Sequence, residues 1–204
     1  MIIKHWDKIY KNNFPCELSW FQKKNRLSIM LIKKYLSNKH KSIFDIGTGV
    51  SCLPKSLIEE GYKKVFFSDI SIEALNHSKS QFSKRPKGYV WLQVDITKPS
   101  KLKPFSLWHD RAVFHFLRDE KDQLQYKKNL TNHLDKSGFV IISTFNMKGP
   151  DKCSGLKTVK YNKHTLLQVF GDEFEFIEEI KEIHFTPDSK KQNFSYFILK
   201  RSSK

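Results

Sequence analysis

The residues that could carry chemistry in this 204-residue chain begin with the stretch SIFDIGTGVSCLP, residues 42–54. An apolar run passes through Asp45 and breaks at Gly47 and Gly49, with Thr48 between them, before a helical segment. Glycines at a turn from a strand to a helix let the backbone approach a ligand closely. Dinucleotides, nucleoside triphosphates and sulfonium nucleosides all use such turns, so the stretch predicts a ligand from one of these classes.

The residues around the glycines favour one of the three. Cys52 stands where the G-x-G-x-x-G fingerprint of dinucleotide sites has its third glycine, and no G-K-[ST] ending of a Walker loop follows. Asp45 precedes Gly47 by two residues, and a carboxylate suits a cationic ammonium and sulfonium better than a phosphate. The stretch therefore favours an amino-acid-bearing nucleoside, with an NAD-dependent oxidoreductase as the less favoured alternative.

A second acidic residue, Asp69, follows in VFFSDIS, about twenty residues beyond Gly49 and at the end of the next expected strand. A carboxylate there can accept hydrogen bonds from both hydroxyls of a ribose. Ile70 would then pack on the adenine. The alternative is structural: Asp69 caps the helix that begins after Ser71.

The stretch LWHDRAVFHFL, residues 107–117, places polar side chains at the carboxyl end of a further expected strand. Open α/β sheets bind their ligands at this rim. Arg111 and His115 are therefore the candidate functional side chains of this stretch. The alternative is an ion pair between Asp110 and Arg111 that fixes the turn, with His115 packed in the core.

Alternating strands and helices must position these residues. Strands are predicted at 42–46, 63–70, 88–96, 105–114, 138–145, 174–185 and 193–201, and helices at 26–36, 51–61, 71–82, 119–134 and 164–170. Ser51 and Ser71 are the expected N-caps, and Gly61 ends the helix between them. The first five strands predict a parallel sheet of βαβ units, and the short 186–192 connection makes the last two an antiparallel hairpin.

This order of elements, with Asp45, Gly47, Gly49 and Asp69 at the strand ends, resembles the class I S-adenosylmethionine-dependent methyltransferases. The resemblance runs from Trp6 to Lys200 and implies a Rossmann-like, seven-stranded α/β fold with helices on both faces. It implies a single methyltransferase domain over 1–204, with a lid and helix at 1–40, a cofactor-binding core at 41–146, and an acceptor-side loop and terminal hairpin at 147–204.

The resemblance also implies S-adenosylmethionine as cofactor and S-adenosylhomocysteine as product. In that family the acid of the glycine stretch, here Asp45, orients the amino-acid end of the cofactor. The acid of WLQVDIT, here Asp95, or the backbone beside it, reaches the adenine amino group, and Ile96 forms an apolar wall. Asp110 or its backbone would meet the methionine ammonium. The 107–117 stretch would face the methyl acceptor, with Arg111 as the anchor of an anionic acceptor and His115 as a base or acceptor-orienting group. A turn formed by Asp95 before Thr97 is the alternative for that residue.

The segment HWDKIYKNNFPCELSWFQ, residues 5–22, resembles the lid of a subgroup that includes eukaryotic elongation-factor lysine methyltransferases and many uncharacterised bacterial enzymes. Trp6, Tyr10, Trp20 and Phe21 would close over the cofactor, or alternatively would pack as a hydrophobic staple against the sheet. The 107–117 stretch departs from those lysine methyltransferases. We therefore expect an unidentified methyl acceptor, either a protein side chain or a small molecule.

Two later stretches lie near the same edge of the expected sheet. Asn146, Cys153 and Ser154 follow the fifth strand, and His184 and Gln192 flank the hairpin turn. They would complete the acceptor pocket or, alternatively, form an ordinary surface loop.

Composition bounds the remaining possibilities. The net charge of +16 comes from 37 basic and 21 acidic residues. The excess is mostly scattered lysine, so a solvated surface is favoured over nucleic-acid binding or RNA methylation, which remain the alternative. The 3 cysteines and 8 histidines lack metal-ligand spacing, so no metal is expected. No apolar run has the length of a membrane span, and we expect a cytoplasmic monomer without membrane contact.

Overall fold

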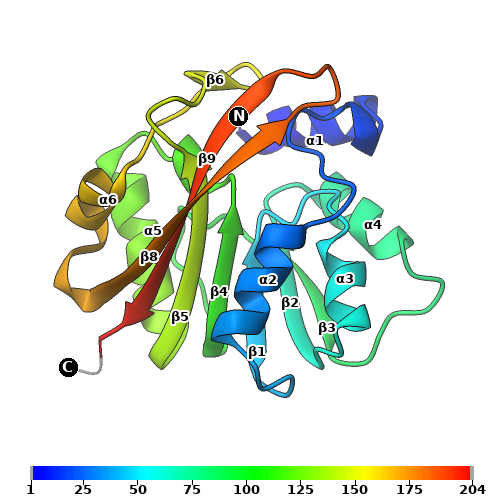
Figure 1. The fold of residues 1–204 in the computed structure, drawn as a ribbon. Helices are drawn as coiled ribbons and strands as arrows, with labels where there is room; N and C mark the ends of the chain where they lie inside the picture. The colour runs from blue at the N-terminus through cyan, green and yellow to red at the C-terminus, as the bar shows by residue number, and fades with distance from the viewer. Residues whose placement is uncertain (1, 203–204) are drawn as a thin grey trace.

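The computed structural model of the chain describes residues 2–202. Its main sheet has seven strands in the order β3-β2-β1-β4-β5-β9-β8, and Figure 1 shows them fanning across the molecule. The strands are β1 (Ser42–Ile46), β2 (Lys64–Asp69), β3 (Tyr89–Gln93), β4 (Phe105–Arg111), β5 (Leu134–Phe145), β8 (Phe174–Phe185) and β9 (Lys191–Arg201). The first five pair in parallel, whereas β9 pairs antiparallel with both β5 and β8. The predicted α/β fold with a terminal hairpin is confirmed.

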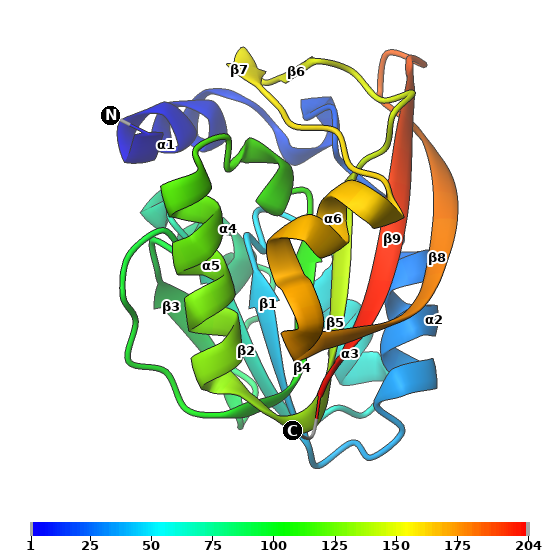
Figure 2. The same ribbon diagram turned by 90° about the vertical axis from the view of Figure 1, so that its left-hand side faces the viewer.

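Helices cover both faces of this sheet. They are α1 (Ile2–Asn12), α2 (Arg26–Tyr35), α3 (Leu53–Glu59), α4 (Ile72–Ser80), α5 (Glu120–His133) and α6 (Lys163–Phe170), with short 3-10 turns η1 (Pro15–Glu17), η2 (Phe114–Phe116) and η3 (Gly171–Glu173). Residues of α2, α3 and α4 share one apolar core with the sheet, and residues of α5 and α6 share the other. Figure 2 shows α5 and α6 on the face opposite α2 and α3. No helix within residues 2–202 is long and apolar enough to cross a lipid bilayer.

The central strands are apolar because both of their faces are covered. In β1 and β4 nearly every residue is buried, as expected for parallel strands between two helical layers. The edge strand β8 instead alternates between exposed and partly buried positions along much of its length, and only Phe174 and His184 in it are buried. The terminal hairpin therefore supplies the half-solvated edge of the sheet.

Two local predictions need correction. The near-helical spacing of Leu27, Met30 and Leu31 in the predicted 26–36 helix would place Met30 on its apolar face. Met30 is instead 51% exposed, and the buried residues of α2 are Ser28, Leu31 and Ile32. The polar Ser28 lies on this buried face because its hydroxyl bonds the side chain of His109 in β4. Ser71 caps α4 as predicted, its hydroxyl accepting from the Ala74 N–H.

The second correction concerns Ser51. Helix α3 begins at Leu53 with Cys52 in the capping position, so Ser51 lies one residue before the cap. Its hydroxyl still accepts from the Leu53 N–H at 3.3 Å. The hydroxyl therefore bonds a free amide of the first turn although it lies outside the capping position.

Two segments cover the carboxyl edge of the parallel strands and form a roof over it. Figure 2 shows α1 and the small hairpin of β6 (Lys152–Cys153) and β7 (Leu156–Lys157) lying above that edge. Helix α1 is tied to the start of α4 by a 2.6 Å hydrogen bond from the Ser71 hydroxyl to Asp7. The roof therefore combines the first and the later parts of the chain.

Candidate active site

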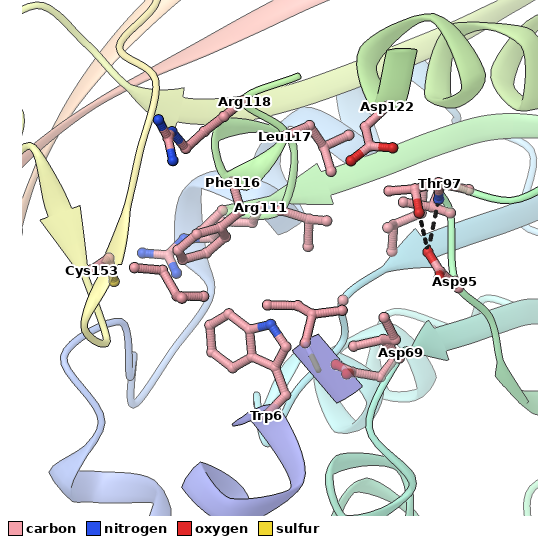
Figure 3. Close-up of a pocket in the computed structure, with 18 of the residues that line it drawn as sticks. Trp6, Asp69, Asp95, Thr97, Arg111, Phe116, Leu117, Arg118, Asp122 and Cys153 are labelled. Atoms are coloured by element: carbon pink, nitrogen blue, oxygen red, sulfur yellow. Dashed lines mark hydrogen bonds between the residues drawn. The ribbon is translucent and has the colours of Figure 1, made fainter. Parts of the chain in front are cut away.

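A cavity of about 400 Å³ opens at the carboxyl edge of the parallel strands, beneath this roof. Its volume lies in the range of small-molecule and cofactor sites. The predicted residues that line it are Trp20, Gly47, Asp69, Ile70, Asp95, Ile96 and Arg111, together with Trp6 and Tyr10 of the expected lid and Cys153 of the later loop. Figure 3 shows Asp69 and Asp95 at one end of the cavity and Arg111 and Cys153 at the other.

The glycine turn after β1 has a backbone that other residues would strain. Gly47 and Gly49 have φ values of +61° and +53°, in the left-handed region. A Cβ on Gly47 would lie 2.1 Å from a methyl group of Val113, and one on Gly49 would lie 3.0 Å from the Tyr10 hydroxyl. The turn therefore needs glycine for its backbone and for the close approach of its neighbours.

The Asp69 carboxylate lines the large cavity and bonds the backbone of two neighbouring turns. One carboxylate oxygen accepts from the Gly49 N–H at 2.9 Å, and the other accepts from the Ser71 N–H at 2.9 Å, where α4 begins. Burial raises the pKa of Asp69 to about 6, although these N–H bonds oppose the shift. The carboxylate thus links the glycine turn to the start of α4 by hydrogen bonds, and it also lines the cavity.

Asp95 also combines a turn with the cavity wall. Its Oδ1 accepts from the Thr97 N–H at 3.0 Å and from the Thr97 hydroxyl at 2.6 Å, and Figure 3 draws both bonds. Asp95 lies two residues beyond the end of β3. Ile70 and Ile96 line the same part of the cavity. An apolar slot with a carboxylate at its rim is thus present where the adenine was expected.

Asp45 lies outside the large cavity, in a buried row of hydrogen-bonded side chains that the sequence did not predict. Its partner in the register of β1 and β4 is His109. The His109 Nδ1 lies 2.6 Å from Asp45 Oδ1, and the Nε2 lies 3.0 Å from the Ser28 hydroxyl of α2. All three residues are at most 2% exposed. Since an ionised carboxylate only accepts, the ring donates its Nδ1–H to Asp45.

A second, smaller cavity of about 40 Å³ lies beside Asp45. It shares the lining residues Trp20, Ile46, Gly47 and Arg111 with the large cavity, so the two cavities adjoin. The buried side-chain atoms around it that have no hydrogen-bond partner within residues 2–202 are Asn25 Oδ1, Asp45 Oδ2, Thr48 Oγ1 and Arg111 Nη2. Buried polar atoms normally find partners, so this concentration points to a polar ligand group.

Arg111 sits at the junction of the two cavities in a fixed orientation. Its Nε donates to the Tyr196 hydroxyl and its Nη1 to the Trp20 carbonyl, each at 3.1 Å. Its Nη2 lies 3.9 Å from a Glu182 carboxylate oxygen, beyond hydrogen-bond distance. Two donors are therefore used to hold the guanidinium, and Nη2 is left for another group. The alternative, an ion pair between Arg111 and Asp110, does not form; Arg111 contacts Glu182 instead.

The structure argues against a cofactor contact by the Asp110 side chain. Asp110 is fully buried and lines neither cavity; its carboxylate accepts from the Val113 and Phe114 N–H groups and from the Tyr126 hydroxyl at 2.9 Å. Burial raises its pKa to about 7. Because side chains alternate along a strand, Asp110 points to the α5 face while His109 points to α2. Its role is to close the η2 turn.

His115 is likewise fully buried and lines neither cavity, so the expected base has no access to an acceptor. Its ring stacks on Phe145 at 4.4 Å between ring centres, and its Nδ1 accepts from the Phe145 N–H. Burial lowers the pKa of His115 to about 3. The alternative reading, a histidine packed in the core, holds.

Of the five residues predicted in the later stretches, only Cys153 lines the large cavity. It is 7% exposed, and burial raises the pKa of its thiol. Asn146 instead bonds the Phe194 carbonyl, and the His184 Nε2 bonds the Ser19 carbonyl at 2.8 Å. His184 and Gln192 line neither cavity, so they hold the hairpin rather than the pocket.

The expected lid supplies aromatic side chains to the cavity. Trp6 and Tyr10 are four residues apart on α1 and so share one helical face. The Trp6 ring packs edge-on against Trp20 at 5.9 Å and against Phe116 at 5.1 Å. Sequence reasoning missed Asn25 and Ser28, because a lone polar residue at the start of a helix carries no signal of a partner far away in the chain.

Comparison with known proteins supports the fold. No protein-family model and no curated protein sequence matches the chain. The N-methyltransferase NodS from Bradyrhizobium japonicum, solved in complex with S-adenosylhomocysteine, superposes with a TM-score of 0.74 at 15% identity over 98% of this chain and 97% of that one.

Two further structures, both described as S-adenosylmethionine-dependent methyltransferases, agree. One from Anabaena variabilis has a TM-score of 0.75 at 15% identity over 98% and 93% of the two chains. One from Methanosarcina mazei has a TM-score of 0.70 at 16% identity over 85% and 98%. The likeness of residues 5–22 to elongation-factor lysine methyltransferases stays a prediction. The chain thus has the Rossmann-like class I fold of the S-adenosylmethionine-dependent methyltransferases.

Proposed function

We propose that this protein is a methyltransferase that binds S-adenosylmethionine across the carboxyl ends of its parallel strands. The observation that carries the proposal is the junction of the two cavities at the glycine turn. The large cavity offers an apolar slot rimmed by Asp69 and Asp95, and the small one offers unpartnered buried atoms of both hydrogen-bonding kinds. A nucleoside that carries an amino acid needs such a pair of sites.

The adenosine would occupy the end of the large cavity near β2 and β3. Asp69 would accept the ribose hydroxyls, because its buried carboxylate keeps lone pairs beyond those used by Gly49 and Ser71. Ile70 and Ile96 would enclose the adenine, with Asp95 beside its amino group. The complex of NodS with S-adenosylhomocysteine, on the same fold, supports this choice of cofactor.

The amino-acid head would enter the small cavity. Its ammonium group suits Asp45 Oδ2 and Asn25 Oδ1, which are acceptors without partners, and its carboxylate suits Arg111 Nη2. A volume of about 40 Å³ admits a head group only, so the rest of the ligand would stay in the large cavity. His109 would keep the Asp45 side chain in one orientation.

Once bound, this cofactor supplies a methyl group on a positively charged sulfur that is open to attack by a nucleophile. The chain itself would contribute alignment and exclusion of water, the latter through Trp6, Trp20 and Phe116. Burial raises the pKa of the Cys153 thiol, so near neutral pH this side chain stays protonated and does not serve as the base.

Calorimetric titration with S-adenosylmethionine, S-adenosylhomocysteine and NAD tests the proposal. We expect binding of the first two and none of NAD; selective NAD binding would overturn it. Asp69→Ala and Asp69→Asn should each weaken S-adenosylhomocysteine binding by at least about tenfold, because hydrogen bonds from the ribose to a charged acceptor are lost. Asp172→Ala is the control, since Asp172 is an exposed carboxylate away from both cavities. Circular dichroism verifies that each variant is folded.

A further inference from the structure

The end of the large cavity opposite Asp69 is lined by aromatic side chains. Phe145, Cys153 and Phe194 form a small buried cluster, against which Trp20 and Phe116 pack. The Phe145 and Phe194 rings lie 4.7 Å apart between centres. These walls favour a flat, apolar group, because the partly buried rings of Trp20 and Phe116 can pack on it and release apolar surface from water.

Positive charge gathers at this same end. Arg118 and Lys157 line the cavity and are exposed, and within residues 2–202 no hydrogen bond or ion pair engages either side chain. Figure 3 shows Arg118 on the side of Arg111 and Cys153, whereas Asp122 lies beside Thr97 with Asp95, at the adenosine end. The remaining carboxylate of the rim, Asp119, belongs to the start of α5. Apart from Asp119, which directly follows Arg118, the carboxylates of the cavity lining thus lie at one end and the two free cations at the other.

We infer that the methyl acceptor is a small aromatic molecule with a carboxylate or similar anionic group, which Arg118 and Lys157 hold at the mouth. This inference rests on the proposed function, since the acidic end is assigned to adenosine. Two unpaired cations suit a carboxylate, and arginine can bind it with two parallel hydrogen bonds. The overall charge of +16 attracts anions to the site as well.

A small acceptor fits the cavity better than a macromolecule does. The volume of about 400 Å³ has to hold most of the cofactor as well as the acceptor. Helix α1 and the β6–β7 hairpin lie over the carboxyl edge in Figure 2, and residues of both line the cavity. The reacting group of the acceptor must pass beneath this roof, which leaves room for a ring rather than for a folded surface.

Titration of the protein saturated with S-adenosylhomocysteine tests the charge preference. The probes are benzoate, benzamide and benzylamine, which share one ring and differ in the charge of its substituent. We expect benzoate to bind at least about tenfold more tightly than either of the others, since only benzoate pairs with the two cations. Equal affinities, tighter binding of benzylamine, or no binding of any of the three would overturn the inference.

Charge reversal locates the site. Arg118→Glu and Lys157→Glu should each weaken benzoate binding by about tenfold or more while leaving S-adenosylhomocysteine binding intact. Lys152→Glu is the matched control: Lys152 faces Lys157 in the register of the same hairpin, is exposed, and does not line the cavity. If Lys152→Glu weakened benzoate binding as much as Lys157→Glu, a general surface potential would account for the binding and the inference would fail.

Transfer of a labelled methyl group into a cell lysate gives an independent readout. We expect the label in the fraction of small anions, which anion exchange retains. Label in the protein or the RNA fraction would overturn the inference and leave the proposed methyltransferase activity standing. Failure of S-adenosylhomocysteine to bind at all would instead overturn the proposed function, so the two failures are distinguishable.

Discussion

Replacing His109 by phenylalanine should destabilise the protein far more than the loss of an ordinary hydrogen bond. Asp45 Oδ1 bonds His109 at 2.6 Å, whereas Oδ2 has no partner within residues 2–202. Phenylalanine fills a similar volume, so the variant leaves no large cavity, but the 2% exposed carboxylate of Asp45 loses its partner. Leaving a buried group without its hydrogen-bond partner costs about 1–3 kcal/mol, and more when that group is a charged carboxylate. That is a large share of the roughly 5–15 kcal/mol by which domains are stable.

A double-mutant cycle separates the charge from other effects. Asp45→Asn by itself keeps an acceptor for the His109 ring and should cost about 1 kcal/mol. The double variant has no unpaired charge, so it should be about 2 kcal/mol more stable than the sum of the single changes predicts. His133→Phe is the control, because the His133 Nε2 bonds a neutral carbonyl, that of Ser100, and its loss should cost about 1 kcal/mol.

Urea unfolding near neutral pH, followed by far-ultraviolet circular dichroism without ligand, measures these free energies. The slope of the free energy against urea concentration has to stay unchanged for the comparison to hold. Additivity of the two changes to within about 0.5 kcal/mol would refute the reasoning, since it would mean that His109 and Asp45 do not stabilise each other.

Three further outcomes follow from the site and its surroundings. Gly47→Ala should lower the free energy of unfolding by about 1–3 kcal/mol more than Gly61→Ala, measured by urea unfolding, because both have positive φ but only the Gly47 Cβ meets Val113, whereas nothing lies within 4 Å at Gly61. Equal losses would exclude the clash. The affinity for S-adenosylhomocysteine, measured by calorimetry, should fall by up to about tenfold per pH unit below the Asp69 pKa of about 6, as the carboxylate is protonated, and Asp69→Asn should flatten this profile. The pKa of His115 is about 3 in the fold against 6.5 ordinarily, so the folded state holds the ring neutral. The free energy of unfolding is therefore at its full value above pH 6.5 and falls below pH 6.5, as the unfolded chain takes up a proton at this ring. Between about pH 7.5 and 5.5, wild type should therefore lose about 1.4 kcal/mol more than His115→Phe, and parallel urea midpoints for the two proteins would contradict this.

The fold could be predicted largely from local patterns. Short apolar runs that alternate with helical segments predicted the parallel strands, and the short 186–192 connection predicted the antiparallel hairpin, which the sheet order confirms. The capping role of Ser71 was equally local. The buried face of α2 could not be predicted in this way, because Ser28 faces the sheet and bonds His109, which lies 81 residues away in the chain.

By itself the sequence determined which side chains stand at the strand ends: the glycine turn, Asp69, Asp95 and Arg111. These positions depend on the period of a strand and on the turn that follows, and both are local properties. The tertiary structure alone decided which of two adjacent residues in a strand faces a cavity.

Asp110 and Arg111 are adjacent, so they point to opposite sides of the strand. Packing of α5 on one side places Asp110 in the core, and packing of the Trp20 segment on the other side places Arg111 in the site. His115 was decided in the same way, by the Phe145 ring against which it stacks. Such contacts join residues far apart in the chain, and no local pattern encodes them.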